Sequence, residues 1–297
     1  MNYRKPDMKF KLVDFLYIVM IIIPIVAGWV MKVLFIPESD GIQITGAYIF
    51  FTIPLPLQDL PITESQINSW IVLISLFFVC LYMTHGIKSK VYTRRAVIAE
   101  WLVEKTEDLV KGNMGDYFKG MAPFIASILA LSALSSLMSL LGLFSPTSDL
   151  NVVAGWAILV FFLITYYKMK CGPLHYLKSF GEPVPFLAPL NIISEVATPV
   201  SMAFRHYGNI LSGAVISVLV AAALTELSKL VFGWLPGFLG EFPILRIGIP
   251  AILSIYFDLF SGCLQAFIFA MLTMLYIGGA FPLEDYLARK KAKVKKA

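Results

Sequence analysis

Charged side chains are scarce in this chain: Asp, Glu, Lys and Arg make up 14% of its 297 residues, whereas hydrophobic residues make up 58%. A soluble domain has about 25% charged residues. The mean hydropathy of +0.79 comes from long apolar runs rather than from one compact core. The composition therefore excludes an ordinary soluble domain and predicts an all-α polytopic membrane protein.

Cysteine and histidine are also rare, with three of each. Cys80, Cys171 and Cys263 are far apart and lie in or near apolar runs, which predicts reduced, structural cysteines rather than a disulfide framework. No two histidines have the spacing of metal ligands on a helix, and no Gly-Lys-Ser/Thr phosphate loop occurs. We expect no metal, no cofactor and no nucleotide site, so the chain is not predicted to be an enzyme by itself.

The apolar runs predict about six membrane helices in a single membrane domain over residues 1–297. The predicted spans are 12–36, 66–84, 122–144, 152–168, 190–231 and 248–278. The short link between the third and fourth spans predicts an antiparallel hairpin. Residues 96–114 have an amphipathic pattern, and we expect this helix to lie on the inner membrane surface.

Basic residues gather at particular places between the spans. They precede the first span, follow the second and fill the tail at 285–297, whereas residues 37–64 have acidic groups and no Lys or Arg. By the positive-inside rule both termini are cytoplasmic. We interpret these basic segments as topology signals rather than nucleic-acid sites. The first run is too long for a signal peptide and predicts a retained span.

The helix predicted at 190–231 is too long to stand upright in a bilayer. Forty-odd residues extend for about 60 Å, roughly twice the hydrocarbon thickness. Either this helix bends at Pro199, or it lies strongly tilted in the membrane.

Both long helices have one polar face. Intervals of three and four residues separate the polar positions, which places each set on one side of an α-helix. The first set is Ser194, Thr198, Ser201, Arg205, Asn209 and Ser212, and the second is Ser254, Asp258, Ser261 and Gln265.

Arg205 gives these faces their significance. An arginine cannot lose its charge in a protein, and placing it at mid-bilayer costs roughly 2.5–3.5 kcal/mol on insertion scales. Together, Arg205 and Asp258 favour an ion path over a structural Arg–Asp pair between helices. Serine and threonine hydroxyls often bond to their own helix instead. His206 points about 100° away from Arg205, so a capping or interface role remains open beside a proton role.

Two motifs resemble subunit a of the rotary F-type ATP synthase. The run PLNIISEVATPVSMAFRHYGN at 189–209 is similar to the bacterial and chloroplast pattern that ends Pro-x-Ser-x-x-x-Arg-x-x-Gly-Asn. The run LQAFIF at 264–269 is close to a motif of the family's last helix. Weaker matches at 62–70 and 122–123 extend the resemblance over about residues 60–280.

The resemblance implies a stator whose two long helices face a ring of c subunits. Arg205 would separate two half-channels and attract each deprotonated ring carboxylate. Glu195 would serve the inner half-channel and Asp258 the outer one, while Asn209 and Gln265 would line or orient the aqueous paths. Ser201 and His206 are further candidates for the ion path. The implied partners are the c ring, the peripheral-stalk b subunits and, indirectly, the soluble catalytic sector, in a bacterial inner membrane.

The chain departs from the family pattern in three places. The family usually has Glu nine residues after the arginine, where this chain has Ala214, and commonly His or Glu at the position of Asp258. The span at 12–36 has no counterpart in the usual five-span pattern and is expected to contact the stalk or lipid. Proton and sodium both remain open as the ion. The alternative function is a stand-alone secondary transporter with an Arg–Asp site, although the two halves of the chain differ.

Overall fold

The computed structural model describes residues 12–36, 46–56, 58–85, 94–170, 172–181, 184–234, 243, 245–283 and 286–287. Six helices among these residues are long and apolar enough to cross a membrane, which confirms the predicted fold class. The basic residues before the first span, and all but two residues of the tail at 285–297, lie outside the described residues.

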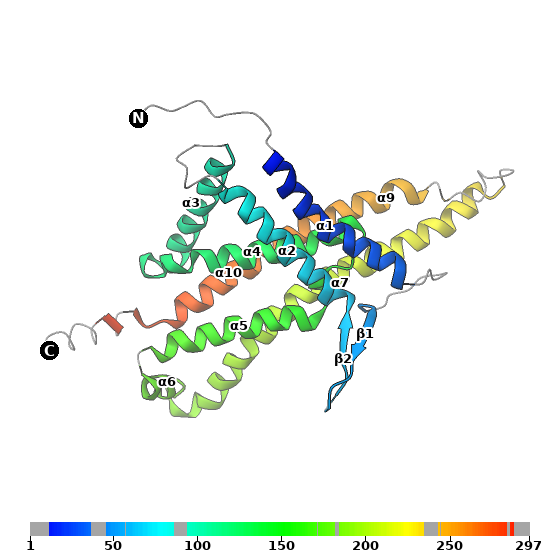
Figure 1. Ribbon diagram of the computed structural model, residues 1–297. Helices are drawn as coiled ribbons and strands as arrows, with labels where there is room; N and C mark the ends of the chain where they lie inside the picture. The colour runs from blue at the N-terminus through cyan, green and yellow to red at the C-terminus, as the bar shows by residue number, and fades with distance from the viewer. Residues whose placement is uncertain are drawn as a thin grey trace. The chain divides into compact units, whose positions relative to one another are not determined.

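Figure 1 shows helices of very different lengths together with one short β-hairpin. The longer helices are α1 (Leu12–Phe35), α2 (Glu64–Thr84), α3 (Arg94–Met114), α4 (Ala122–Leu137), α5 (Leu150–Met169), α7 (Ala188–Phe232), α9 (Leu245–Ser254) and α10 (Gly262–Ala280). The short helices are α6 (Pro173–Ser179) and the 3-10 turns η2 (Asp116–Met121), η3 (Met138–Leu141), η4 (Pro146–Ser148) and η5 (Pro185–Leu187).

The hairpin was not predicted from the sequence. Strands β1 (Ile49–Ile53) and β2 (Leu60–Thr63) pair antiparallel, with Ile53 opposite Leu60. The backbone N–H of Glu64 donates to the carbonyl of Tyr48 at 2.7 Å, so the hairpin leads directly into α2. Its residues lack a clean alternation of apolar and polar side chains, which is the usual strand signal.

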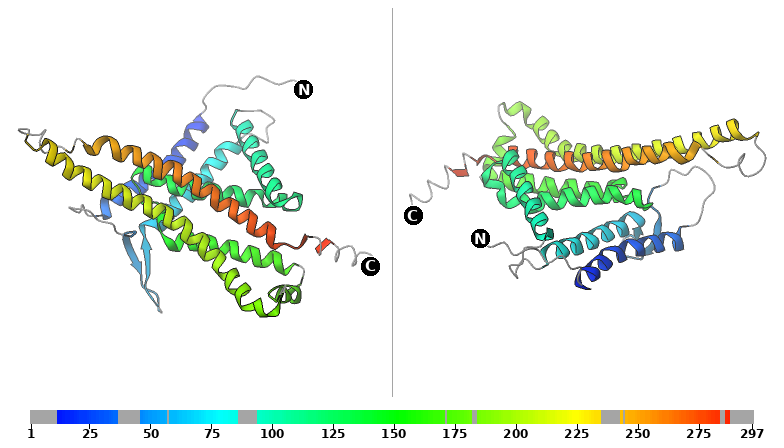
Figure 2. Two further views of the ribbon diagram at one scale, coloured as in Figure 1. Left: turned by 180° about the vertical axis from the view of Figure 1, so that it is seen from behind. Right: turned by 90° about the horizontal axis from the view of Figure 1, so that it is seen from above.

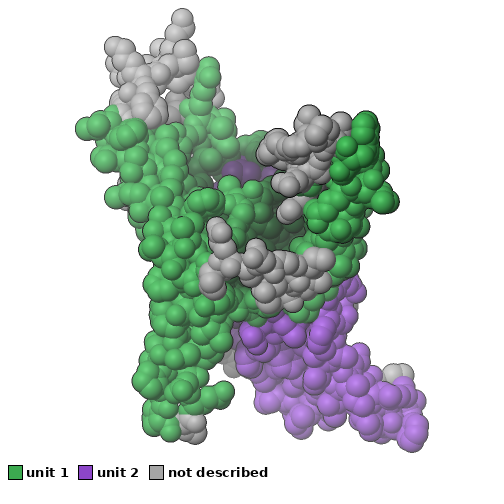
Figure 3. All heavy atoms as spheres, turned by 90° about the vertical axis from the view of Figure 1, so that its right-hand side faces the viewer, with its two compact units in different colours: residues 1–101, 130–149, 207–266 green, residues 102–129, 150–206, 267–297 purple. Residues whose placement is uncertain are grey.

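The contacts divide the chain into two compact units, drawn in different colours in Figure 3. Unit 1 comprises residues 1–101, 130–149 and 207–266, and unit 2 comprises residues 102–129, 150–206 and 267–297. The single membrane domain expected from the sequence stays a prediction.

Unit 2 has a core formed by five helices. Ile125 of α4 and Val160 of α5 are fully buried there. The core also receives Val110 from α3, Met202 from α7 and Phe269 from α10. The predicted surface helix therefore exists as α3, with its last turns packed into this core; its position on the membrane stays a prediction.

Unit 1 has a smaller core between α2 and the end of the α4 segment. Ile67, Ile71 and Val72 of α2 pack with Met138 and Leu143. Helix α1 lies against α2, where its one buried residue, Gly28, allows close approach. A Cβ at Gly28 would lie 2.5 Å from Cδ1 of Ile71.

Helix α7 runs without a break over 45 residues and contains Pro199. Figure 2 shows it as one continuous ribbon. A straight helix of that length is about 68 Å long, more than twice the roughly 30 Å of bilayer hydrocarbon, so α7 cannot stand upright in a membrane. Proline at 199 has no N–H to donate to the carbonyl of Glu195, yet the helix continues through it.

The last long helix contains an irregular turn. A π-helical segment, η6 (Ile255–Ser261), joins α9 to α10 and includes Asp258. The i→i+5 hydrogen bonds of a π-helix widen the turn, and such segments are frequent at functional sites. The sequence predicted one regular helix over 248–278, and the intervals of its polar residues do not reveal this change of backbone.

Candidate ion path

Arg205 lies on an exposed face of α7. Ser194, Ser201 and Ser212 share this exposure, so four of the six residues of the predicted polar face point outward. The other two, Thr198 and Asn209, are half-buried at its edge. Thr198 donates its hydroxyl to the carbonyl of Ser194 at 2.9 Å, which is the bond to its own helix expected for such residues.

The guanidinium of Arg205 forms no ion pair with any carboxylate among the described residues of unit 2. A permanent charge within a membrane span requires a partner, a polar interior or water. Arg205 is therefore exposed rather than paired in the described part of unit 2.

The residues beside Arg205 face the core instead. Met202 and Ala203 are buried in unit 2, and His206 is fully buried. The His206 ring lies edge-on to Phe269, at 5.4 Å between ring centroids, and to Trp156 at 6.2 Å. These aromatic surroundings support the interface role for His206 that the sequence left open.

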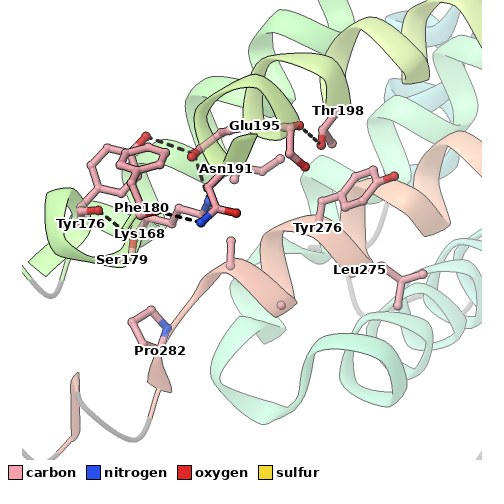
Figure 4. Close-up of a pocket in the computed structure, with 14 residues that line it drawn as sticks. Lys168, Tyr176, Ser179, Phe180, Asn191, Glu195, Thr198, Leu275, Tyr276 and Pro282 are labelled. Carbon is pink, nitrogen blue, oxygen red and sulfur yellow. Dashed lines mark hydrogen bonds and ion pairs between the residues drawn. The ribbon is translucent and has the colours of Figure 1, made fainter. Parts of the chain in front are cut away.

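A cavity of about 660 Å³ opens in unit 2 near the start of α7 (Figure 4). Glu195, Asn191 and Thr198 line it from α7, and Tyr276 lines it from α10. Asn191 donates its amide to the carbonyl of Phe180 at 2.8 Å, which ties α7 to the segment that precedes it.

Glu195 is the acidic group in this cavity, and its side chain is 9% exposed. Nζ of Lys168, at the end of α5, lies 3.0 Å from Oε1 of Glu195. The hydroxyl of Tyr176, in α6, donates to the same oxygen at 3.1 Å. Burial, followed by the negative charge of Glu195, raises the pKa of Tyr176, so this hydroxyl stays protonated and able to donate.

A second polar group lies in unit 1 around η6. The hydroxyls of Ser139, from η3, and Ser254 face the Asp258 side chain, and η3 contacts η6. Nδ2 of Asn209 on α7 donates to Oγ of Ser261 at 2.9 Å, so the two predicted polar faces meet within this unit. Gly213 helps this approach, because a Cβ there would lie 3.1 Å from the Phe257 side chain.

Gln265 and Ala214 are two further positions that the sequence analysis singled out. Gln265 is buried at the start of α10, with 5% of its surface exposed. Ala214, at the position where the family usually has Glu, is exposed on α7 and has no polar side chain. Of the two positions 214 and 258, on facing helices, 214 has no acidic group, and the acidic residue of η6 is Asp258.

Sequence reasoning did not find Lys168 or Tyr176. Lys168 lies at the end of a span, where a basic residue is interpreted as a topology signal. Its pairing with Glu195, 27 residues later in the chain, depends on how α5, α6 and α7 fold together. No periodicity in the sequence indicates that contact.

Apolar membrane helices with a permanent cation on one exposed face and carboxylates in polar surroundings define an ion-translocating membrane protein. Comparison with known proteins identifies the family within this class. The profile of the family described as ATP synthase A chain matches residues 66–278.

Individual relatives of this chain are named ATP synthase subunit a. The chain is 31% identical over 228 residues to the ATP synthase subunit a of Legionella pneumophila strain Paris, covering 76% of this chain and 90% of the relative. It is 31% identical to that of Priestia megaterium over 236 residues, with 74% and 94% covered. The sodium-ion-specific ATP synthase subunit a of Propionigenium modestum is 28% identical over 276 residues, with 82% and 88% covered.

The chain belongs to the ATP synthase A chain family, whose members are the ion-translocating stator subunits of F-type ATP synthases. It is a non-catalytic subunit of the membrane sector and a multi-pass bacterial membrane protein. The alternative of a stand-alone secondary transporter is not supported, because the family match includes both polar helices.

Proposed function

We propose that this chain carries protons through two separate half-channels to and from the carboxylates of a c ring. The observation that supports this proposal best is Arg205 itself, exposed within a membrane span and without a carboxylate partner in the described part of unit 2. A ring that presents one carboxylate after another supplies such a partner and also allows it to leave. The energy available is about 2.3 kcal/mol for each proton that crosses 100 mV.

The cavity around Glu195 is proposed as the inner half-channel. Glu195 precedes Arg205 by ten residues, which is about 15 Å along α7. A largely buried carboxylate that lines a cavity of about 660 Å³ can accept and release a proton on its way to the ring. Lys168 and Tyr176 hold this carboxylate in place through its Oε1 atom.

Asp258 is proposed as the proton-carrying group of the outer half-channel. Asn209, Ser261 and Gln265 would orient water around it, and Ser201 would lie on the surface that faces the ring. In this arrangement Ala214 contributes no acid, so Asp258 acts without the second carboxylate common in the family. Both termini are proposed to be cytoplasmic, and the peripheral-stalk b subunits and the soluble catalytic sector would be the further partners.

Cysteine cross-linking in the assembled complex tests the ring-facing surface. Ser201→Cys should form disulfides with cysteines placed beside the c-subunit carboxylate, because Ser201 is exposed next to Arg205 along α7. Met202→Cys is the matched control, since Met202 is only 2% exposed. Equal cross-linking from the two positions, or none from Ser201→Cys, would contradict the proposed surface.

The inner half-channel has its own prediction. Tyr176→Phe removes one hydrogen bond to Glu195 and should slow proton transport by about two- to tenfold, whereas Glu195→Gln removes the charge and should slow it more. Transport is measured in inverted vesicles with a pH-sensitive dye. Tyr166→Phe, at an exposed position of α5, is the control; the same loss in that variant would remove Tyr176 from the path.

A further inference from the structure

Helix α1 lies outside the part of the chain that the family profile matches, which begins at residue 66. It is nevertheless bound to α2 at several points along its length. Oγ of Ser75 on α2 donates to the carbonyl of Ile21 at 3.2 Å. Further along, Gly28 packs against Ile71, and a Cβ there would lie 3.6 Å from Oδ1 of Asn68. These contacts fix the end of α1 that holds Trp29 and Lys32.

Trp29 and Lys32 bind the backbone that follows η3. Nε1 of Trp29 donates to the carbonyl of Leu141 at 3.1 Å. The ammonium of Lys32 donates to the carbonyl of Gly142, whose φ of +72° is in the left-handed region that favours glycine. Loop carbonyls that end a membrane hairpin need such donors, because hydrocarbon supplies none.

Helix α2 binds Phe144, two residues further along the same loop. Nδ2 of Asn68 donates to the carbonyl of Phe144 at 2.8 Å, and Oε1 of Glu64 accepts its N–H at 3.4 Å. The Lys32 ammonium also interacts with the charge of Glu64. Side chains from α1 and α2 therefore satisfy four backbone groups over residues 141–144.

The segment just before this loop, η3, contacts η6, which contains Asp258, within the same unit. Ser139, in η3, is two residues before Leu141, and the Ser139 hydroxyl faces Asp258. Its hydroxyl donates to the carbonyl of Ser136, at the end of α4, at 2.8 Å. The groups that face Asp258 in the described part of unit 1 are thus the hydroxyls of Ser139 and Ser254.

We propose that α1 is a brace for the outer ion path, in which Trp29 and Lys32 are positioning residues that hold Ser139 against Asp258. Neither residue touches the transported ion; both act through the carbonyls of Leu141 and Gly142. This inference rests on the proposed role of Asp258. It gives the additional helix a function that a lipid-facing anchor would not have.

The test uses the whole ATP synthase in liposomes, with the proton concentration varied on the outer side alone. Trp29→Phe and Lys32→Gln should each change the apparent KM for the external proton by about two- to tenfold, the range expected for one lost hydrogen bond. Maximal rate and the dependence on internal pH should stay close to those of the unmodified complex. Lys32→Arg should restore the KM, because a guanidinium can still donate to Gly142.

Matched controls separate this effect from general disturbance. Trp234, two residues after α7 ends, donates to the carbonyl of Val231 in that helix, and Lys229 pairs with Glu226 within it. Trp234→Phe and Lys229→Gln should therefore leave the KM unchanged. Native gels report whether each variant complex assembles. An equal KM change in the controls would overturn the proposal.

A double-mutant cycle with Ser139→Ala tests the route through Ser139. If α1 acts by positioning this serine, Trp29→Phe should add little to the KM change that Ser139→Ala already causes. Full additivity, or no KM change in both Trp29→Phe and Lys32→Gln, would overturn the brace. Failure of the proposed function is distinguishable, because it would appear as normal transport in Asp258→Asn.

Discussion

Replacing Arg205 with alanine should abolish ATP-driven proton pumping while the complex still assembles. Arg205 is exposed, and its guanidinium forms no ion pair within the described part of unit 2, so its removal leaves no buried charge unpaired in that unit. What is lost is the fixed cation that binds a ring carboxylate and separates the two paths. Pumping is measured as quenching of a pH-sensitive dye in inverted vesicles, and assembly by native gel electrophoresis.

Two further variants sharpen this experiment. Arg205→Lys should also pump poorly, because a lysine can lose its proton in an apolar site whereas an arginine cannot. Ser212→Ala lies on the same exposed face two turns later and should pump normally. Normal pumping by Arg205→Ala would refute the central role given to this residue.

Asp258→Asn should reduce transport strongly, on the order of a hundredfold, as expected when a group that transfers protons is removed. Asparagine keeps the size of the side chain and an oxygen that can face the hydroxyls of Ser139 and Ser254. The variant therefore removes the exchangeable proton with little change in packing. Initial rates of proton uptake driven by ATP provide the measurement.

The control for this change is Asp108→Asn, which removes a carboxylate from an exposed position of α3. It should transport at the normal rate. Asp258→Glu should recover part of the lost rate, because it restores an ionisable carboxyl group in η6. If Asp258→Asn transports as fast as the unmodified complex, Asp258 does not belong to the ion path.

The residues that were found from the sequence are those whose chemistry conflicts with their surroundings. Arg205 and Asp258 are charged groups in apolar runs, and their spacing to other polar residues identified the faces of two helices. The Asn209–Ser261 hydrogen bond confirms that these faces meet within unit 1. The six spans were predictable for the same reason, because membrane helices require long apolar runs.

What the sequence did not predict depends on tertiary contacts or on backbone geometry. Lys168 and Tyr176 reach Glu195 from separate helices, and neither is unusual for its place in the sequence. The π-helical turn at Asp258 leaves no pattern of its own, because intervals of three and four residues also fit an α-helix. Trp29 and Lys32 similarly gain their importance from the loop that they bind.

Pro199 has a consequence for hydration. In a regular helix the residue at this position would donate its N–H to the carbonyl of Glu195, and proline has none to give. The backbone oxygen of Glu195 therefore lacks its i+4 donor, beside a cavity that Glu195 lines. A bound water is held by two to four polar partners, and here one residue offers both a carbonyl and a carboxylate. Pro199 would thus leave a backbone carbonyl to which a water molecule can bind at the inner end of α7.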